Sequence, residues 1–191
     1  MTRYAIALGT AALVLVASSP SRAGDIQGNA GCGSRCSDYV LYVESAPGDH
    51  TGEDTVANFD QENKVFVPHV LPIVKGTTVR IGNSDPFLHN VHIYLGKETI
   101  LNSALPFQGQ TIDEVFEEEG NYLVLCDAHP EMSAFIVVLG HPFFAQPDET
   151  GGFEILGLAP GNYTLIRYDA ENEKSTQKQV IVGEGPVEVS F

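Results

Sequence analysis

The sequence is poor in basic residues. It has 10 Lys and Arg against 25 Asp and Glu, which gives a formal net charge of −15 at pH 7. No stretch is basic enough to neutralise phosphates, so we expect neither nucleic acid nor anionic membrane surfaces as partners. A cationic protein partner fits this charge. The plain alternative is that the acidic residues only maintain solubility.

Long hydrophobic runs are also absent. The longest apolar run, residues 5–17, is interrupted by one glycine and one threonine, and a membrane span needs about 20 apolar residues. Arg3 precedes this run, and small residues at Ser21 and Ala23 follow it. This pattern is typical of a secretory signal peptide that is cleaved near Ala23. We therefore expect a periplasmic or secreted protein, with no membrane insertion of the mature chain.

Cysteine is scarce, and its count is odd. The chain has Cys32, Cys36 and Cys126, and in an oxidising compartment an odd count leaves one thiol free, intermolecular or metal-bound. The first two lie close enough in sequence to pair in a glycine-flanked loop, so a disulfide is the favoured interpretation. A copper-delivery pair is the alternative, although the flanking prolines typical of such pairs are missing. Cys126 is then the unpaired cysteine.

Helical periodicity is missing as well. No window of useful length has apolar residues at helical spacing, whereas short β-type runs alternate with Gly, Pro and Asn. Residues 24–35 are glycine-rich and are expected to be loose. The pattern indicates an all-β fold, an antiparallel sandwich or barrel. The predicted strands are at residues 39–44, 65–74, 77–81, 91–95, 111–116, 122–126, 134–139, 152–155, 164–168, 179–182 and 187–191.

The composition changes near Gly140, which suggests a boundary. The expected organisation is a signal peptide (1–23), an N-terminal segment with one strand (24–56), a β domain (57–140) and a small β-rich unit (141–191). The last unit is small for an independent core. We expect it to pack on the β domain and to be completed by the strand of the N-terminal segment.

The segment with the most informative chemistry is the loop between the strands predicted at 122–126 and 134–139. It places Cys126, His129 and Met132 at intervals of three. A His2Cys set with a weak axial Met suits both the softer Cu(I) and Cu(II). The second histidine must come from elsewhere, and His89 stands at the start of its own strand. The sequence therefore predicts one type I copper ion bound by these four residues.

Two counts support this interpretation. Met132 is the only methionine left once the signal peptide is removed, and Cys126 is the only cysteine without a neighbour. Chance would seldom place both in one short loop beside a histidine. The alternative is a buried cysteine, a surface histidine and a core methionine on an ordinary hairpin.

Residues 88–92 (Leu-His-Asn-Val-His) and the Cys-x2-His-x2-Met loop resemble the cupredoxin family, with a loop spacing closest to amicyanin and plastocyanin-like proteins. The resemblance covers residues 58–139. It implies a Greek-key β-sandwich that holds a blue copper centre at one end. It also implies that Asn90 ties the His89 loop to the Cys126 loop, and that His129 is the electron exit.

The C-terminal unit resembles a different family. Residues 151–155 and 158–165 are similar to carboxypeptidase regulatory-like (transthyretin-type) β-sandwiches, although the first strands of such a unit are missing.

Other polar residues near the motif receive lesser roles. His92 lies three positions from His89 and in a strand would face away from it. Asp85 stands in an Asn-Ser-Asp-Pro segment and is interpreted as a turn former. Asp127 and Glu131 are interpreted as charges at the rim of the site.

The expected function is one-electron transfer between redox proteins of the cell envelope, and not catalysis. The partner is expected to be cationic, for example a c-type cytochrome, docking where His129 emerges through an apolar rim of Pro130 and Pro72. Two alternatives stay open: a copper carrier, and a docking module that merely contains a copper domain.

Overall fold

The computed structural model describes residues 23–191, so the predicted signal peptide lies outside the described residues except for Ala23. Within this part, the regular secondary structure is almost all β-strand, which confirms the predicted all-β fold, and no helix is long and apolar enough to cross a membrane. A single 3-10 turn, η1, covers Cys36–Asp38. The strands are β1 (Gly24–Asn29), β2 (Tyr39–Val43), β3 (Val56–Glu62), β4 (Val65–Val67), β5 (Val70–Val74), β6 (Thr78–Asn83), β7 (His89–Leu95), β8 (Glu98–Leu105), β9 (Gln110–Val115), β10 (Gly120–Leu125), β11 (Ser133–Leu139), β12 (Phe144–Ala145), β13 (Gly152–Leu158), β14 (Gly161–Asp169), β15 (Lys174–Val182) and β16 (Pro186–Ser190).

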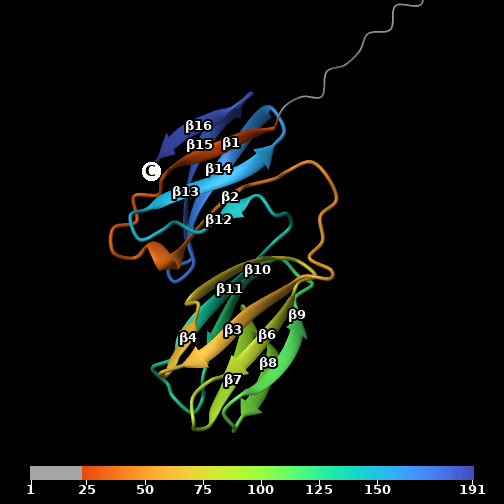
Figure 1. Ribbon diagram of the computed structural model, residues 1–191, viewed down its shortest axis with the longest axis vertical. Helices are drawn as coiled ribbons and strands as arrows, with labels where there is room; N and C mark the ends of the chain where they lie inside the picture. Colours follow the sequence, from red (N-terminus) through yellow and green to blue (C-terminus); the bar gives the residue numbers. More distant parts are fainter. Residues whose placement is uncertain (1–22) are drawn as a thin grey trace, which may run out of the picture.

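The strands form two sandwiches, seen as the lower and upper lobes in Figure 1. In the first, the sheets β5-β11-β10-β7-β8 and β4-β3-β6-β9 enclose one apolar core. In the second, the sheets β13-β1-β16 and β12-β2-β14-β15 enclose another. The second sandwich therefore combines strands from both ends of the described chain, with β2 hydrogen-bonded to β12 and β14.

Strand β1 corrects the prediction that residues 24–35 are loose and that the N-terminal segment holds one strand. It pairs with β13 on one side and with β16 on the other, and Ile26 is fully buried. At Gly28 an added Cβ would lie 1.7 Å from the backbone oxygen of Val189. The glycine that suggested a loop is thus required by the close approach of a neighbouring strand.

The single strand predicted over residues 65–74 is also wrong. This stretch forms β4, which pairs with β3, and β5, which pairs with β11 in the opposite sheet. Pro68 stands between them, and proline cannot donate a ladder hydrogen bond. Strands β3 and β8, which the sequence pattern did not predict, complete the two sheets of the first sandwich.

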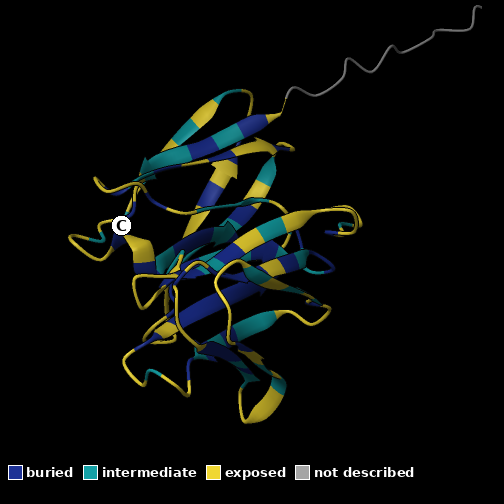
Figure 2. Cartoon of the chain, turned by 60° about the horizontal axis from the view of Figure 1, so that its bottom comes forward, coloured by how far each residue is buried: buried dark blue, intermediate teal, exposed yellow. Residues whose placement is uncertain are grey.

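Strand β11 joins the two sandwiches because it is buried on both faces. Successive side chains of a strand point to opposite sides. Ala134, Ile136 and Val138 belong to the core of the first sandwich. Phe135, Val137 and Leu139 face the other way and pack with Val40 and Ala170 of the second sandwich. We call this cluster the junction core; its buried members are Val40, Val70, Phe135, Val137, Leu139 and Ala170. Figure 2 shows buried positions along the strands and mostly exposed positions in the loops.

The predicted disulfide is present between Cys32 and Cys36, in the loop that leads into η1. Cys126 is the free cysteine of the described residues, and it is buried. The thiol is therefore held inside the first sandwich, away from the disulfide loop.

Candidate metal centre

The loop of residues 126–132 connects β10 to β11 and is closed by two successive turns. The amide of His129 donates to the carbonyl of Cys126 at 3.2 Å, and the amide of Met132 donates to the carbonyl of His129 at 2.9 Å. Bonds from residue i to i+3 place side chains three apart on the same side. The loop follows the last pair of the hairpin, Leu125 with Ser133, at the end of the sheet opposite to Gly140, where the chain leaves for the second sandwich.

His89 is the first residue of β7, and its side chain is fully buried. The loop before it is fixed by Asn83, whose side-chain amide donates to the carbonyls of Phe87 at 2.9 Å and Leu105 at 2.8 Å. Since β7 pairs directly with β10, the start of β7 lies beside the 126–132 loop. Residues from two separate segments thereby reach one point.

Three donor atoms form a compact triangle at this point. The Sγ of Cys126 lies 3.7 Å from Nδ1 of His89 and 3.7 Å from Nδ1 of His129, and the two nitrogens lie 3.0 Å apart. No other group of three such donors lies close enough to hold a metal ion within residues 23–191. Two ring nitrogens this close repel each other unless a proton or a cation lies between them.

The size of the triangle fits a first-row transition metal. A point equidistant from the three atoms lies about 2.0 Å from each, and Zn–N and Zn–S bonds, for comparison, measure about 2.0–2.3 Å. Two imidazole nitrogens and one thiolate are the trigonal donor set of copper electron-transfer sites. The donor set therefore fits copper without rearrangement of the three side chains.

Met132 is the fourth residue of the predicted set. Its side chain is only 2 % exposed and belongs to the same core cluster as Cys126. The turn at His129 that precedes it places it on the side of the loop that faces the core. A buried thioether there is available as a weak axial donor.

Asn90 connects the two ligand-bearing segments. Its side-chain oxygen accepts the amide hydrogen of Asp127, and its side-chain nitrogen donates to Asp127 Oδ2 at 3.1 Å. Its own amide points at the Sγ of Cys126, 3.5 Å away. These contacts connect the start of β7 to the 126–132 loop and so favour the arrangement that forms the donor triangle.

Asp127 is more than the rim charge that the sequence suggested. Its carboxylate contacts His92, with Nδ1 3.2 Å from both oxygens, and also Asn90 and Asn102. The bond with His92 is the largest reason why the pKa of Asp127 lies below its usual value. His92 thus faces away from the donor triangle and supports the loop from outside, with Tyr94 hydroxyl 2.8 Å from its Nδ1.

Phe87 is a site residue that the sequence pattern did not reveal. Its ring centroid lies 5.2 Å from that of His89 and 5.6 Å from that of His129, and it is 37 % exposed. It therefore covers both imidazoles on the solvent side. His129 is partly exposed whereas His89 is fully buried. His129 and Phe87 therefore connect the donor triangle to the protein surface.

Asp85 was interpreted as a turn former, and the structure gives it a second contact. Its amide donates to Asn83 Oδ1 at 2.9 Å, as a turn residue would. Its carboxylate, however, points inward and lies 2.8 Å from Nε2 of His89. Burial alone would raise the pKa of Asp85, but hydrogen bonds from the Lys64 amide, His89 and the Asn63 amide outweigh it and lower the pKa.

Pro72 does not belong to the apolar rim around His129. It pairs with Val137 in the middle of β11 and borders a cavity shared with Pro142 and Phe144. It therefore lies toward the second sandwich. Pro130 is exposed in the 126–132 loop, next to His129, which leaves Pro130 and Phe87 as the apolar surface at this end.

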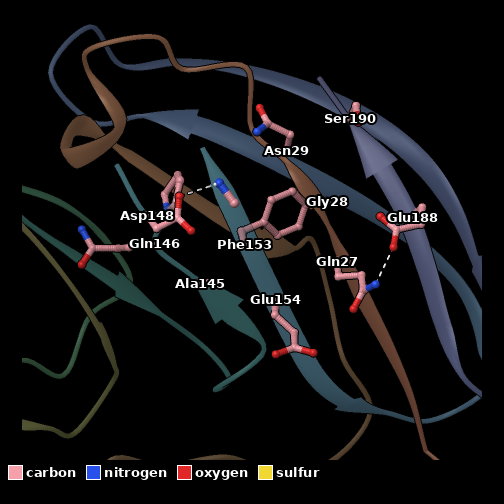
Figure 3. A pocket seen from close by; sticks show the side chains of 12 residues that line it. Gln27, Gly28, Asn29, Ala145, Gln146, Asp148, Phe153, Glu154, Glu188 and Ser190 are labelled. Atoms are coloured by element: carbon pink, nitrogen blue, oxygen red, sulfur yellow. Dashed lines mark hydrogen bonds between the residues drawn. The ribbon is translucent and has the colours of Figure 1, made fainter. Parts of the chain in front are cut away.

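A separate, open concavity of about 710 Å³ lies on the second sandwich, against the sheet β13-β1-β16 (Figure 3). Some of its polar side chains are already hydrogen-bonded: Gln27 donates to Glu188, and Asp148 accepts the amides of Thr150 and Gly152. Neither histidine nor cysteine is among its lining residues. It is therefore no second candidate for a transition-metal centre.

Comparisons with known proteins find similarity only at the level of structure. Protein-family models do not match the sequence, and neither do curated proteins. A purple cupredoxin from Nitrosopumilus maritimus is 29% identical over 44% of this chain and 99% of its own, with a TM-score of 0.39. A copper-containing nitrite reductase from Thermus scotoductus SA-01 is 27% identical over 50% of this chain and 25% of its own, with a TM-score of 0.42.

A reduced amicyanin variant is 23% identical over 52% of this chain and 98% of its own, with a TM-score of 0.41. These cupredoxin structures thus cover about half of this chain, and the chain spans only a quarter of the nitrite reductase. Because the TM-scores are low, the function of this chain has to be inferred from the geometry of its own site.

Proposed function

We propose that this protein binds one copper ion through His89, Cys126 and His129, with Met132 as a weak axial ligand, and transfers single electrons. The observation that supports this most directly is the triangle of two Nδ1 atoms and one Sγ, whose centre lies about 2.0 Å from each donor. When bound, copper supplies the one-electron couple that protein side chains lack. The direct test is the intense thiolate-to-copper absorption expected after addition of Cu(II).

The surroundings of the triangle support electron transfer over metal delivery. His89, Cys126 and Met132 are each at most 2 % exposed, so a receiving protein could not replace them one by one. Four protein donors also leave no open position for a substrate, which argues against an enzyme. A carrier would instead release its copper quickly to a chelator, so slow release is the expected result.

We further propose that the protein is exported, on the strength of the signal-like pattern in residues 1–23, and that the second sandwich is a carboxypeptidase regulatory-like unit. The packing of Val40 and Ala170 against β11 supports a role in holding the copper sandwich. This packing leaves the opposite end of the copper sandwich, where His129 and Phe87 lie, available to a redox partner.

Met132→Leu is expected to keep the visible colour and to raise the reduction potential. Leucine fills the buried site with similar volume, but it removes a weak donor that stabilises Cu(II) more than Cu(I). A tenfold change in relative affinity corresponds to about 59 mV for one electron, and we expect at least that shift by voltammetry. A lower potential would contradict Met132 as the axial ligand.

Charge at the His129 end is expected to steer a cationic partner such as a basic c-type cytochrome. Glu131 is exposed in the 126–132 loop, whereas Glu173 is exposed in the turn between β14 and β15 of the second sandwich. Glu131→Lys should slow electron exchange several-fold at low salt, and Glu173→Lys should change it little. Stopped-flow rates provide the measurement.

The same rates should fall as salt rises, because the Debye length shrinks from about 30 Å at 0.01 M to about 10 Å at 0.1 M. Equal sensitivity of the rate to both reversals would mean that the negative charge serves solubility and marks no docking face. Absence of exchange with any cationic partner would favour the copper carrier.

A further inference from the structure

Asp85 and His89 form a buried carboxylate–imidazole pair behind the proposed metal ligands. The Oδ2 of Asp85 lies 2.8 Å from the Nε2 of His89, and the two side chains are 7% and 0% exposed. A pair so well shielded from water is held by defined hydrogen bonds and not by loose electrostatic attraction. The far side of the His89 ring is therefore fixed by one residue.

The carboxylate is itself held on both oxygens. Oδ1 accepts the amide hydrogen of Asn63 at 2.8 Å, and Oδ2 accepts that of Lys64 at 2.9 Å. These two residues form the turn between β3 and β4 and have positive φ angles of 55° and 59°. The turn thus directs two backbone amides at Asp85, and Asp85 in turn contacts the proposed metal ligand His89. The turn belongs to the four-stranded sheet, whereas His89 belongs to the five-stranded sheet.

This arrangement selects one tautomer of His89. A carboxylate only accepts hydrogen bonds, so Nε2 must carry the proton. In a neutral imidazole, Nδ1 then keeps its lone pair, and Nδ1 is the atom in the donor triangle. His129 has no comparable partner, since no side chain of residues 23–191 hydrogen-bonds to its Nε2, which leaves the two histidine ligands unequal.

We propose that Asp85 is a positioning residue that fixes the tautomer and ring orientation of His89 and, through its negative charge, favours the oxidised over the reduced metal. The proposal rests on the proposed copper-binding function for its second part. Hydrogen bonding of a ligating histidine to a carboxylate raises the basicity of the ligand. A more basic nitrogen and a nearby anion both stabilise Cu(II) more than Cu(I).

Two substitutions separate orientation from charge. Asp85→Asn keeps an oxygen that can accept the His89 proton but removes the charge. It should therefore preserve the tautomer and lower the preference for Cu(II) over Cu(I) about tenfold, which corresponds to a rise of about 59 mV in potential. Asp85→Ala removes the acceptor, and it should release the tautomer and weaken Zn(II) binding about 10–100-fold.

The matched control is Asp60→Asn. Asp60, in β3, accepts a hydrogen bond from Ser84, the residue before Asp85, and has no hydrogen bond with His89. Removal of its charge should therefore shift the potential far less. ¹⁵N NMR of the metal-free wild-type protein is expected to show His89 protonated at Nε2. Protonation at Nδ1, or a potential shift in Asp85→Asn no larger than in Asp60→Asn, would overturn the proposal.

The tautomer of His89 is measured in the metal-free wild-type protein, so this test depends neither on copper binding nor on the folding of a variant. If the wild-type protein shows no thiolate-to-copper absorption, the proposed function fails. Nε2 protonation in the metal-free protein would then still support the orienting role of Asp85, and Nδ1 protonation would still refute it.

Discussion

We expect Cys126→Ser to abolish the intense visible absorption that the proposed copper-loaded protein should show, while the β-sandwich stays folded. The absorption arises from electron transfer within the thiolate–metal bond, and a serine hydroxyl stays protonated and offers only hard oxygen. Cys126 also supplies the corner of the triangle that is 3.7 Å from both histidine nitrogens. Its loss therefore removes the colour and the strongest anionic donor together.

The fold should survive because serine is close to cysteine in size and the other members of the core cluster are unchanged. The strands on both sides of the loop, β10 and β11, pair through six residues each, and their inward side chains remain. Far-UV circular dichroism should match the wild-type spectrum. The matched control replaces Cys32 and Cys36 by serine. These two cysteines form a disulfide, so their removal should leave the colour intact.

Full colour in Cys126→Ser would refute the assignment, because no other thiol in residues 23–191 is free. Loss of a second bound copper in the Cys32 and Cys36 double variant, measured as copper per protein, would instead place a second copper site at the disulfide loop. That outcome would favour the copper-delivery interpretation of the pair.

Local spacing explains how much of the metal centre could be predicted. Cys126, His129 and Met132 lie on one loop, where a period of three and two flanking strands already imply convergence. His89 could be added because it starts a strand and precedes Asn90 in a family-like segment. The three residues of the donor triangle could therefore be identified from two short sequence segments.

The supporting contacts could not be predicted in this way. Asp85 looks like a turn residue, and it is one; its bond to His89 depends on two amides from the β3–β4 turn, more than twenty residues earlier. Strand β1 has few apolar residues, and its partners β13 and β16 lie at the other end of the chain. Hydrogen bonds between distant segments leave no periodic trace in the sequence.

The junction between the sandwiches was legible only in part. The uninterrupted apolar run of β11 is typical of a strand buried on both faces, but the run does not say what covers its second face. In the structure, that face packs against Val40 and Ala170, and Asn121 donates to the carbonyl of Ala170 at 3.0 Å. Burial at this junction also raises the pKa of Tyr168 to about 12.

Val40→Asp is expected to destabilise both sandwiches together. Val40 is fully buried in the junction core, and an uncompensated buried charge costs about 3–5 kcal/mol. In a chain of this size 1 kcal/mol lowers the unfolding midpoint by roughly 2–4 °C, so we expect a decrease of about 6–20 °C. Thermal unfolding should be followed both by far-UV circular dichroism and by the visible copper band.

The two signals should move by the same amount, because the junction core makes β11 part of both sandwiches and β11 begins directly after the 126–132 loop. Leu156→Asp is the matched control: it adds the same charge to the second sandwich, at a side chain that is 57% exposed, and should leave both midpoints unchanged. A copper band that keeps its wild-type midpoint in Val40→Asp, while the dichroism signal falls early, would show that the two sandwiches unfold independently.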